Sequence, residues 1–564
     1  MPQRGPRLYK VLPIVIALAV CASPRVAAAE SPDEDWMYQL QSEAVETGVS
    51  PAANWGPDPE RYSSWTTHSN RLIPVYTYGT AGGGHGVDLD TYIGENSAYR
   101  DVRALARLYG RHGRESLNPT ADYLDQTNLF DLQMAALKTG RKYIFLVVFD
   151  GMDWETTRAA SVWNLGQVSY NKGRGTGTHF QDYDAGGTSQ FGWMVTSPYC
   201  DRMPAEVDGP AGFGASVNLT GGYDATLGGA APWAAPSQIE YLIEGPPNAA
   251  LRHAKTDSAA SATSMNCGIK TFNEAIGVDV YGVPQTAVAH HAQLAGYRVG
   301  VVTSVPISHA TPAATYAHQT SRDEFQQISR DLLGLPSASH PEQPLVGMDV
   351  VIGTGHGVES PIDPKQGDDF VPGNVYLTDA DREKIDAENG GAYIVAQRTA
   401  GQDGGQGLQA AAERAADKHQ RLLGFYGVGG MIPYLSGHLP FASANGDYRP
   451  APGIDGRPMH YTAADLAENP SLAEMTTAAL TVLGHDGAPF WLMVEAGDVD
   501  WANHSNNLDA AIGAVNSGDE AVRVITRWVE EHSNWDESLM IVTADHGHYL
   551  FLDRPELLIP PSSE

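Results

Sequence analysis

The stretch that decides the fold is YIFLVVF, residues 143–149, which runs directly into Asp150. Four further apolar, β-rich runs follow, with helical stretches between them, at residues 297–303, 345–353, 489–494 and 539–543. Continuous apolar strands separated by helices are typical of a parallel sheet that is covered on both faces. The sequence therefore predicts an α/β fold with a central, mostly parallel sheet flanked by helices.

Three of these runs end at or beside an acidic residue. YIFLVVF precedes Asp150, PFWLMV precedes Glu495, and LMIVTA precedes Asp545, which His546 follows. In open α/β sheets, ligands bind outside the carboxyl ends of the strands. One acid after a strand is unremarkable because turns favour Asp, but three acids and a neighbouring histidine predict a shared metal centre.

Asp500 and His504 are four residues apart, shortly after Glu495. On a helix this spacing places both side chains on one face, where they can bind the same metal ion. A carboxylate and an imidazole together suit zinc. Such pairs also cap and solvate helices, so their position five residues beyond a strand-end glutamate is what favours a ligand role.

The tetrapeptide KTDS ends at Ser258 and precedes a helix-like run of small residues, AASATSMNCGIK. At a helix N-terminus, the macrodipole and the free amides favour an alkoxide and a bound phosphate. A nearby metal would lower the hydroxyl pKa further and generate a nucleophile. On this motif alone, a plain N-cap role for Ser258 is equally open.

Thr311 and Pro312 resemble a helix cap followed by a first-turn proline. Arg322 lies eleven residues after Thr311, about three turns at 3.6 residues per turn, so the two can point the same way if the helix continues. Arginine suits bidentate phosphate recognition. Most isolated arginines lie on the surface, so only the context favours a role for Arg322.

Five segments are similar to site segments of the alkaline phosphatases, and they occur in family order over residues 143–548. They are FDGMDW (149–154), TDSAASATSMNCGIKTFNEAIGVD (256–279), SHATPAATYAH (308–318), VEAGDVDWANHSNN (494–507) and TADHGH (543–548). The resemblance implies hydrolysis of phosphate monoesters by way of a phosphoserine intermediate. It also implies three resident metal ions, two Zn²⁺ and one Mg²⁺.

The resemblance implies a role for each matching residue around the second zinc. Asp150 would bridge this zinc and the magnesium, and Asp545 with His546 would complete the zinc site. Ser258 would be the nucleophile, and Arg322 would clamp the phosphate.

The resemblance likewise assigns the magnesium and the first zinc. Thr311 and Glu495 would bind magnesium, with water molecules completing the octahedron, and His309 would stand near that site, where the family has Asp or His. Asp500 and His504 would bind the first zinc.

One family ligand is missing from its usual place, since a further first-zinc histidine is expected well downstream of the ADH segment, where 18 residues remain. The segment WTTHSNRLIPVYTYG (65–79) resembles that late family segment, and YIGENSAYRDVRALARLYG (92–110) resembles the next part of the family sequence. The chain is therefore similar to a circularly permuted member, with His68 as the third ligand. His548 and His85 are the alternatives.

The chain divides into a few regions of different character. Residues 1–29 have a basic start, a ten-residue apolar run and a small-residue end, as in a secretory signal, although an uncleaved anchor is the alternative. Residues 30–125 resemble the usual C-terminal part of the family, and residues 126–564 form the main body, with loop-rich insertions near 160–250 and 355–392. The signal predicts a periplasmic or secreted protein.

The composition limits the partners. A net charge of −31 argues against nucleic-acid binding through a basic surface. No second apolar run is long enough to span a membrane, and small-molecule phosphate monoesters are the expected substrates. Family members are often dimers, but the altered termini and insertions could block that interface, so a homodimer stays open. Pairing of Cys200 with Cys267 also stays open.

Two other functions compete with a phosphomonoesterase. The first is another enzyme of the same superfamily. Sulfatases need a C/S-x-P-x-R setting, which TDSAAS lacks, whereas a phosphodiesterase would keep the metal ligands. The second is a metal-dependent phosphate-binding protein with an impaired first-zinc site.

Overall fold

The computed structural model describes residues 35–561, apart from 111–112, 114–115, 202–218, 244, 246–247 and 430–436. The predicted signal segment lies outside the described residues. Within the described part of the chain, no helix combines the length and the apolar character needed to cross a membrane.

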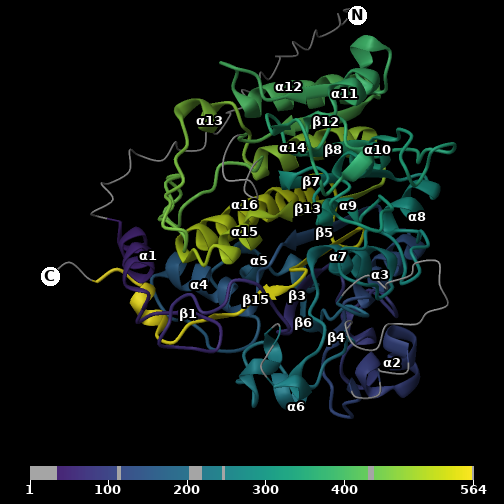
Figure 1. Cartoon of the computed structure of the whole chain (residues 1–564). Coiled ribbons are helices and arrows are strands. Elements are labelled where there is room, and N and C mark those ends of the chain that lie inside the picture. The colour runs from purple at the N-terminus through teal and green to yellow at the C-terminus, as the bar shows by residue number, and fades with distance from the viewer. Residues whose placement is uncertain are drawn as a thin grey trace, which may run out of the picture.

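A ten-stranded sheet runs through the centre of the molecule (Figure 1). In spatial order its strands are β11 (Tyr393–Gln397), β12 (Arg421–Tyr426), β8 (Val350–Thr354), β7 (Arg298–Pro306), β13 (Phe490–Ala496), β5 (Tyr143–Phe149), β14 (Ser538–Thr543), β3 (Ile73–Tyr78), β6 (Gln190–Val195) and β4 (Leu124–Asp125). Only β3 runs antiparallel to its neighbours, β14 and β6. The predicted mostly parallel sheet is confirmed.

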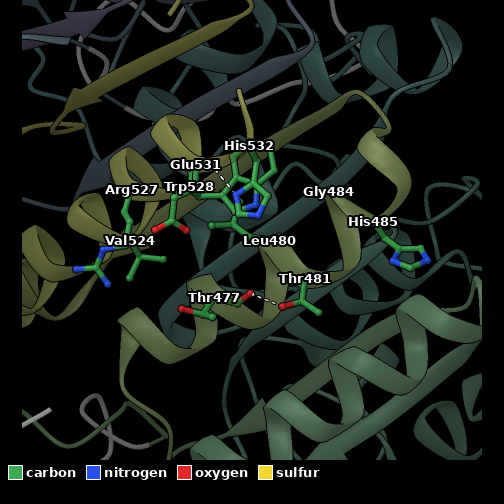
Figure 2. A pocket seen from close by; sticks show the side chains of 10 residues that line it. All are labelled: Thr477, Leu480, Thr481, Gly484, His485, Val524, Arg527, Trp528, Glu531 and His532. Carbon is green, nitrogen blue, oxygen red and sulfur yellow. Dashed lines mark hydrogen bonds between the residues drawn. The ribbon is translucent and has the colours of Figure 1, made fainter. Parts of the chain in front are cut away.

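The central strands are buried along their whole length. Every residue of β5, β13 and β14 is buried, which explains why these strands read as continuous apolar runs. Two groups of helices flank the sheet. One contains α4 (Trp154–Leu165), α12 (Gly404–Lys418), α14 (Leu472–Leu483) and α16 (Leu508–His532), and the other contains α3 (Asn128–Thr139), α7 (Ser258–Cys267), α8 (Val288–Leu294) and α9 (Ala310–Ala313). A groove of about 370 Å³ lies between α14 and α16 (Figure 2).

The first hundred residues of the described chain contribute to the same central sheet as the rest. They supply β3, which lies between β14 and β6, and the loop-rich stretch 160–250 supplies β6 itself. Two short antiparallel pairs join the two ends of the chain: β1 (Asn54–Trp55) with β16 (Leu550–Phe551), and β2 (His68–Ser69) with β15 (Gly547–His548).

The stretch 355–392 is mostly irregular. It contains the small pair β9 (Glu359–Ser360) and β10 (Gly373–Asn374), followed by α11 (Asp379–Ile385). Cys200 and Cys267 are both buried, and no disulfide joins them to each other.

Candidate metal centre and nucleophile

Three acidic side chains meet where three neighbouring strands end. β13 and β14 both pair in parallel with β5, so their carboxyl ends lie at one edge of the sheet. Asp150 directly follows β5, Glu495 is the second-last residue of β13, and Asp545 lies two residues after β14. All three side chains are fully buried. The predicted convergence of strand-end acids is therefore present in the fold.

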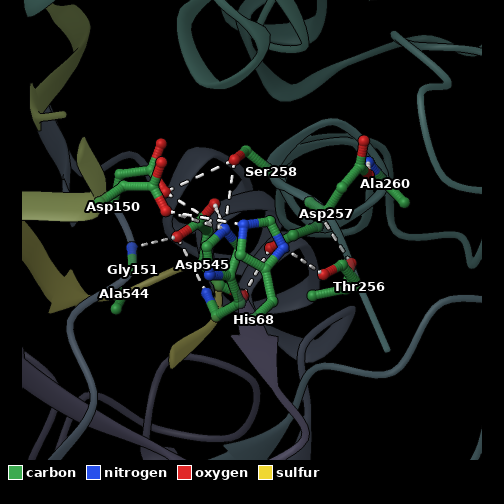
Figure 3. A network of polar contacts seen from close by, with 12 residues as sticks. His68, Asp150, Gly151, Thr256, Asp257, Ser258, Ala260, Ala544 and Asp545 are labelled. Atoms are coloured by element: carbon green, nitrogen blue, oxygen red, sulfur yellow. Dashed lines mark hydrogen bonds and ion pairs between the residues drawn. The ribbon is translucent and has the colours of Figure 1, made fainter. Parts of the chain in front are cut away.

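Asp150, Asp545 and His546 form one group of potential metal ligands (Figure 3). The Nε2 atom of His546 lies 3.3 Å from Asp150 Oδ1 and 3.4 Å from Asp545 Oδ2. Asp545 Oδ1 accepts the backbone N–H groups of Gly151 and His546, which fixes the carboxylate. The other oxygens, Asp150 Oδ2 and Asp545 Oδ2, are buried without a hydrogen-bond partner. Buried carboxylate oxygens without hydrogen-bond partners are the kind of ligand that a bound cation would satisfy.

Asp500, His504 and His68 form a second group. Asp500 and His504 lie on α15 (Asp498–His504), as the four-residue spacing predicted, and His68 lies on β2. His68 Nε2 is 3.2 Å from His504 Nε2 and 3.6 Å from Asp500 Oδ1. His504 Nε2 is 3.5 Å from the same Asp500 oxygen. Two residues near the C-terminus and one near the N-terminus thus present ligand atoms to a common point.

The outer hydrogen bonds of these two histidines fix their tautomers. His68 Nδ1 lies 3.0 Å from the carbonyl oxygen of Thr256, and His504 Nδ1 lies 2.7 Å from that of Thr66. Because a carbonyl only accepts, each Nδ1 carries a proton, and a neutral imidazole in this tautomer has its lone pair on Nε2. Two lone pairs 3.2 Å apart repel each other unless a cation lies between them, and this arrangement is typical of metal-bound histidine.

His548 belongs to the same group, whereas His85 does not. His548 Nε2 lies 2.7 Å from Asp500 Oδ1, and the β2–β15 pairing sets His548 opposite His68. A protonated Nε2 donating to Asp500 would orient this carboxylate. His85 is exposed and lies outside every ligand group among the described residues.

A third group contains Asp150, Glu495 and His309. The Thr311 side chain lies beside Glu495. One Glu495 oxygen accepts a hydrogen bond from the Thr303 hydroxyl, and the other is buried without a partner. The Thr311 hydroxyl oxygen is likewise buried without a hydrogen bond. Carboxylate and hydroxyl oxygens are the kind of ligand that magnesium prefers.

Ser258 is the first residue of α7, and Asp257 is the N-cap, accepting the N–H of Ala260. The alternative of Ser258 as a plain N-cap is therefore wrong. The buried Ser258 hydroxyl lies 3.2 Å from His546 Nε2 and 3.5 Å from Asp150 Oδ1 (Figure 3). It thus faces the Asp150–Asp545–His546 group from the positive end of a helix.

Two expectations about the segment after β7 are wrong. His309 is the N-cap of α9 and Thr311 lies inside the helix, so Thr311 is not a cap. The helix ends at Ala313, so no continuous helix carries Arg322. Arg322 instead lies in the loop before α10 (Phe325–Leu333), where its Nη1 donates to Asp257 Oδ2 at 3.1 Å. That ion pair, rather than helical periodicity, brings the guanidinium beside the residue that precedes Ser258.

Burial governs the charges in the site. It raises the pKa of Glu495 to about 8 and that of Asp545 to about 6. Burial also lowers the pKa of His546 and His548 to about 3, so both imidazoles are neutral and available as ligands. Burial opposes the charge of Arg322, but Asp257 and Asp150 outweigh it and raise its pKa. Bound cations would relieve the repulsion among the carboxylates.

The chain is similar to known proteins over about half of its length. The sequence model of the alkaline phosphatase family matches residues 248–555. Alkaline phosphatase H of Pseudomonas aeruginosa (strain UCBPP-PA14) is 31% identical over 307 residues, which are 54% of this chain and 60% of that protein. Alkaline phosphatase of Escherichia coli (strain K12) is 29% identical over 322 residues, with the same coverages of 54% and 60%. The chain thus spans about 60% of the length of these relatives.

Among solved structures, Thermus thermophilus alkaline phosphatase is 22% identical, with a TM-score of 0.42. The match covers 72% of this chain and 60% of that one. The family match extends over more than half of the sequence and includes Ser258, Asp500 and Asp545. This chain belongs to the alkaline phosphatase family.

Proposed function

We propose that this protein hydrolyses phosphate monoesters through a phosphoserine intermediate formed on Ser258. The observation that carries the proposal is the position of this hydroxyl, 3.2 Å from His546 Nε2 and 3.5 Å from Asp150 Oδ1 at the start of α7. An ordinary buried serine in a helix bonds to a carbonyl one turn back, whereas Ser258 faces potential metal ligands. Arg322 lies close by through Asp257.

The donor sets fit two zinc ions and one magnesium ion. The first zinc would be held by His68, Asp500 and His504, the second by Asp150, Asp545 and His546, and the magnesium by Asp150, Thr311 and Glu495, with His309 alongside. Bound there, such ions would neutralise charge on the phosphate and lower the pKa of the attacking hydroxyl.

The side chains of this chain would carry out a double displacement. The Ser258 oxygen forms a bond to phosphorus while the bond from phosphorus to the ester oxygen breaks, and the alcohol leaves with a proton. A water oxygen then bonds to phosphorus and the Ser258–phosphorus bond breaks. One proton of the water passes to the Ser258 oxygen, and inorganic phosphate is released. The Arg322 fork binds two phosphate oxygens in both steps, and the N-terminus of α7 favours the negative charge.

We also infer that the chain is circularly permuted relative to its family. The family match begins at residue 248, yet residues 65–79 supply both His68 and strand β3. His68 lies against His504, and β3 is hydrogen-bonded to β14, the strand that leads into Asp545. Three gathered first-zinc donors argue against a phosphate-binding protein with an impaired site. The signal-like residues 1–29 suggest that the enzyme acts in the periplasm or outside the cell.

The test compares wild type with Ser258→Ala and with a control, Ser264→Ala, whose hydroxyl bonds to the Ala260 carbonyl within the same helix. On nitrophenyl phosphate we expect Ser258→Ala to lower kcat by at least about 10³-fold, since a nucleophile is lost. Acid quenching with a ³²P-labelled monoester should label wild type and Ser264→Ala but not Ser258→Ala. Labelling or wild-type kcat in Ser258→Ala would refute the nucleophile, and faster turnover of a nitrophenyl diester would favour a phosphodiesterase.

A further inference from the structure

A second cluster of metal-ligating side chains lies outside the phosphate site. It consists of His419, His485 and Asp486, whose ligand atoms all lie within 4.8 Å of one another. His419 is the C-cap of α12, and the other two residues belong to the 3-10 turn η10 (His485–Gly487) that follows α14. His485 also lines one end of the groove between α14 and α16 (Figure 2).

The distances suit a transition-metal ion. Asp486 Oδ2 lies 3.4 Å from His485 Nε2 and 3.9 Å from His419 Nδ1, and the two imidazole centroids are 5.6 Å apart. A tetrahedral zinc site with bonds of 2.0–2.1 Å has ligand atoms about 3.4 Å apart, so small side-chain rotations bring these three atoms to ligand positions. Two imidazoles and a carboxylate are the donors found in many zinc sites with an open position.

We propose that His419, His485 and Asp486 form a surface site for one divalent transition-metal ion, with zinc as its natural occupant. Water completes the coordination, because the side chains of His419 and Asp486 are 66% and 61% exposed. Bound there, the ion links the end of α12 to the connection between α14 and β13.

The backbone at this cluster supports the assignment. His419 has φ 51° and Asp486 has φ 61°, both in the left-handed region that glycine adopts without strain. The chain nevertheless places a histidine and an aspartate there, and strained non-glycine residues concentrate at ligand sites. Arg298 donates to the carbonyl oxygens of Val482, Leu483 and His485, which holds the turn in place.

Helix ends add to the attraction for a cation. The cluster follows the C-terminus of α12, where the last carbonyl groups of the helix carry partial negative charge. The positive charge of Arg298 compensates much of the partial negative charge at the C-terminus of α14. At the C-terminus of α12, Lys418 is the basic residue in the last turn. Lys418 is exposed, so its charge is screened by solvent.

This site is separate from the phosphate chemistry. It precedes β13, while Glu495 lies near the other end of the same strand. Glu495 lies five positions after Phe490, which corresponds to about 17 Å at about 3.3 Å per residue. An ion here would therefore act on the stability of the fold rather than on the reacting phosphate.

The experiment is a zinc titration of the enzyme with its catalytic metals already bound, followed by calorimetry and elemental analysis. We expect wild type to bind one additional saturable equivalent, with a rise in Tm. The variants His485→Ala, Asp486→Asn and His419→Asn should lose this equivalent and the rise in Tm. Asparagine tolerates the left-handed backbone, so Asp486→Asn and His419→Asn should fold.

His460→Ala is the matched control, because His460 is exposed and belongs to none of the ligand groups among the described residues. It should keep the additional equivalent. Phosphatase activity of each variant on nitrophenyl phosphate, expected at the wild-type level, shows that the fold is intact. The same zinc stoichiometry in all proteins, or loss of the equivalent in His460→Ala as well, would overturn the proposal.

Discussion

At the scale of single residues, His68 is the side chain on which the proposed first-zinc site depends most. His68→Ala removes one of three donors, so we expect zinc content to fall and kcat/KM to drop by about 10²-fold or more. Elemental analysis and a nitrophenyl phosphate assay measure both effects. His85→Ala, at an exposed position outside the site, should change neither. Full zinc occupancy with normal turnover in His68→Ala would refute the ligand role.

The backbone of Gly151 packs directly against Asp500. A Cβ atom at Gly151 would lie 2.9 Å from both Cα and Oδ1 of Asp500, and the residue has φ +70°. Gly151→Ala should therefore push Asp500 out of place and lower kcat/KM by about 10²-fold, the usual cost of misplacement by about 1 Å. Gly166→Ala shares the positive φ but meets no atom within 4 Å, so it should lose some stability and keep activity. Equal activity of the two variants would contradict this explanation.

The positions of site residues on their elements could be predicted from the sequence where they depend on a short local motif. The spacing of Asp500 and His504 on one helix face is confirmed, because that relation depends only on helical periodicity. The capping prediction for Thr311 and the alternative N-cap role of Ser258 are wrong. Which residue caps a helix depends on one backbone angle at the boundary, and neighbouring polar residues compete for that position.

At the scale of elements, burial decides how well a strand can be predicted. The runs at 143–149 and 539–543 agree with β5 and β14 to within one residue, because both strands are buried on two faces. The run at 345–353 forms a strand only from Val350. Gly347 has φ +85° and Val346 is 64% exposed, so the chain enters the strand only at Val350, although Met348 is already buried.

The C-cap of α12 allows a stability prediction that is independent of activity. In the presence of a chelator, His419→Gly should raise the free energy of unfolding by about 1 kcal/mol, because glycine relieves the left-handed conformation. Urea denaturation of wild type and variant in chelator measures the difference. Lys418→Gly, one residue earlier and still helical, should lower stability by about 1 kcal/mol. Destabilisation by His419→Gly would show that the imidazole, even without metal, makes contacts that outweigh the strain.

At the scale of the whole molecule, the buried carboxyl groups make the metal-free protein sensitive to pH. Glu495 has a pKa of about 8 in the folded chain and an ordinary value of 4.5 when unfolded. At a pH between these two pKa values, Glu495 keeps its proton in the folded state and has released it in the unfolded state. The free energy of unfolding therefore falls as pH rises. Buried histidines such as His546, with a folded pKa of about 3, give the opposite slope, but only below their ordinary value of 6.5.

The informative window is therefore pH 6.5 to 8. There the chelated protein should lose on the order of 1–2 kcal/mol of unfolding free energy as pH rises. With metals bound, Glu495 is held ionised and this loss should disappear. Urea denaturation at both ends of the window, with and without chelator, measures the two slopes. Identical slopes would contradict a metal-dependent ionisation of this site.

The sequence by itself determined the sheet class, the acids at the strand ends and the pair on α15, because these depend on local periodicity. Only the tertiary structure decided which distant segments meet. His68 and His504 are 436 residues apart, and Arg322 reaches Asp257 across 65 residues through a loop. Such contacts depend on strand pairing, here of β2 with β15 and of β3 with β14, which a local pattern does not encode. The position of Ser258 beside His546 is likewise a property of the assembled sheet edge.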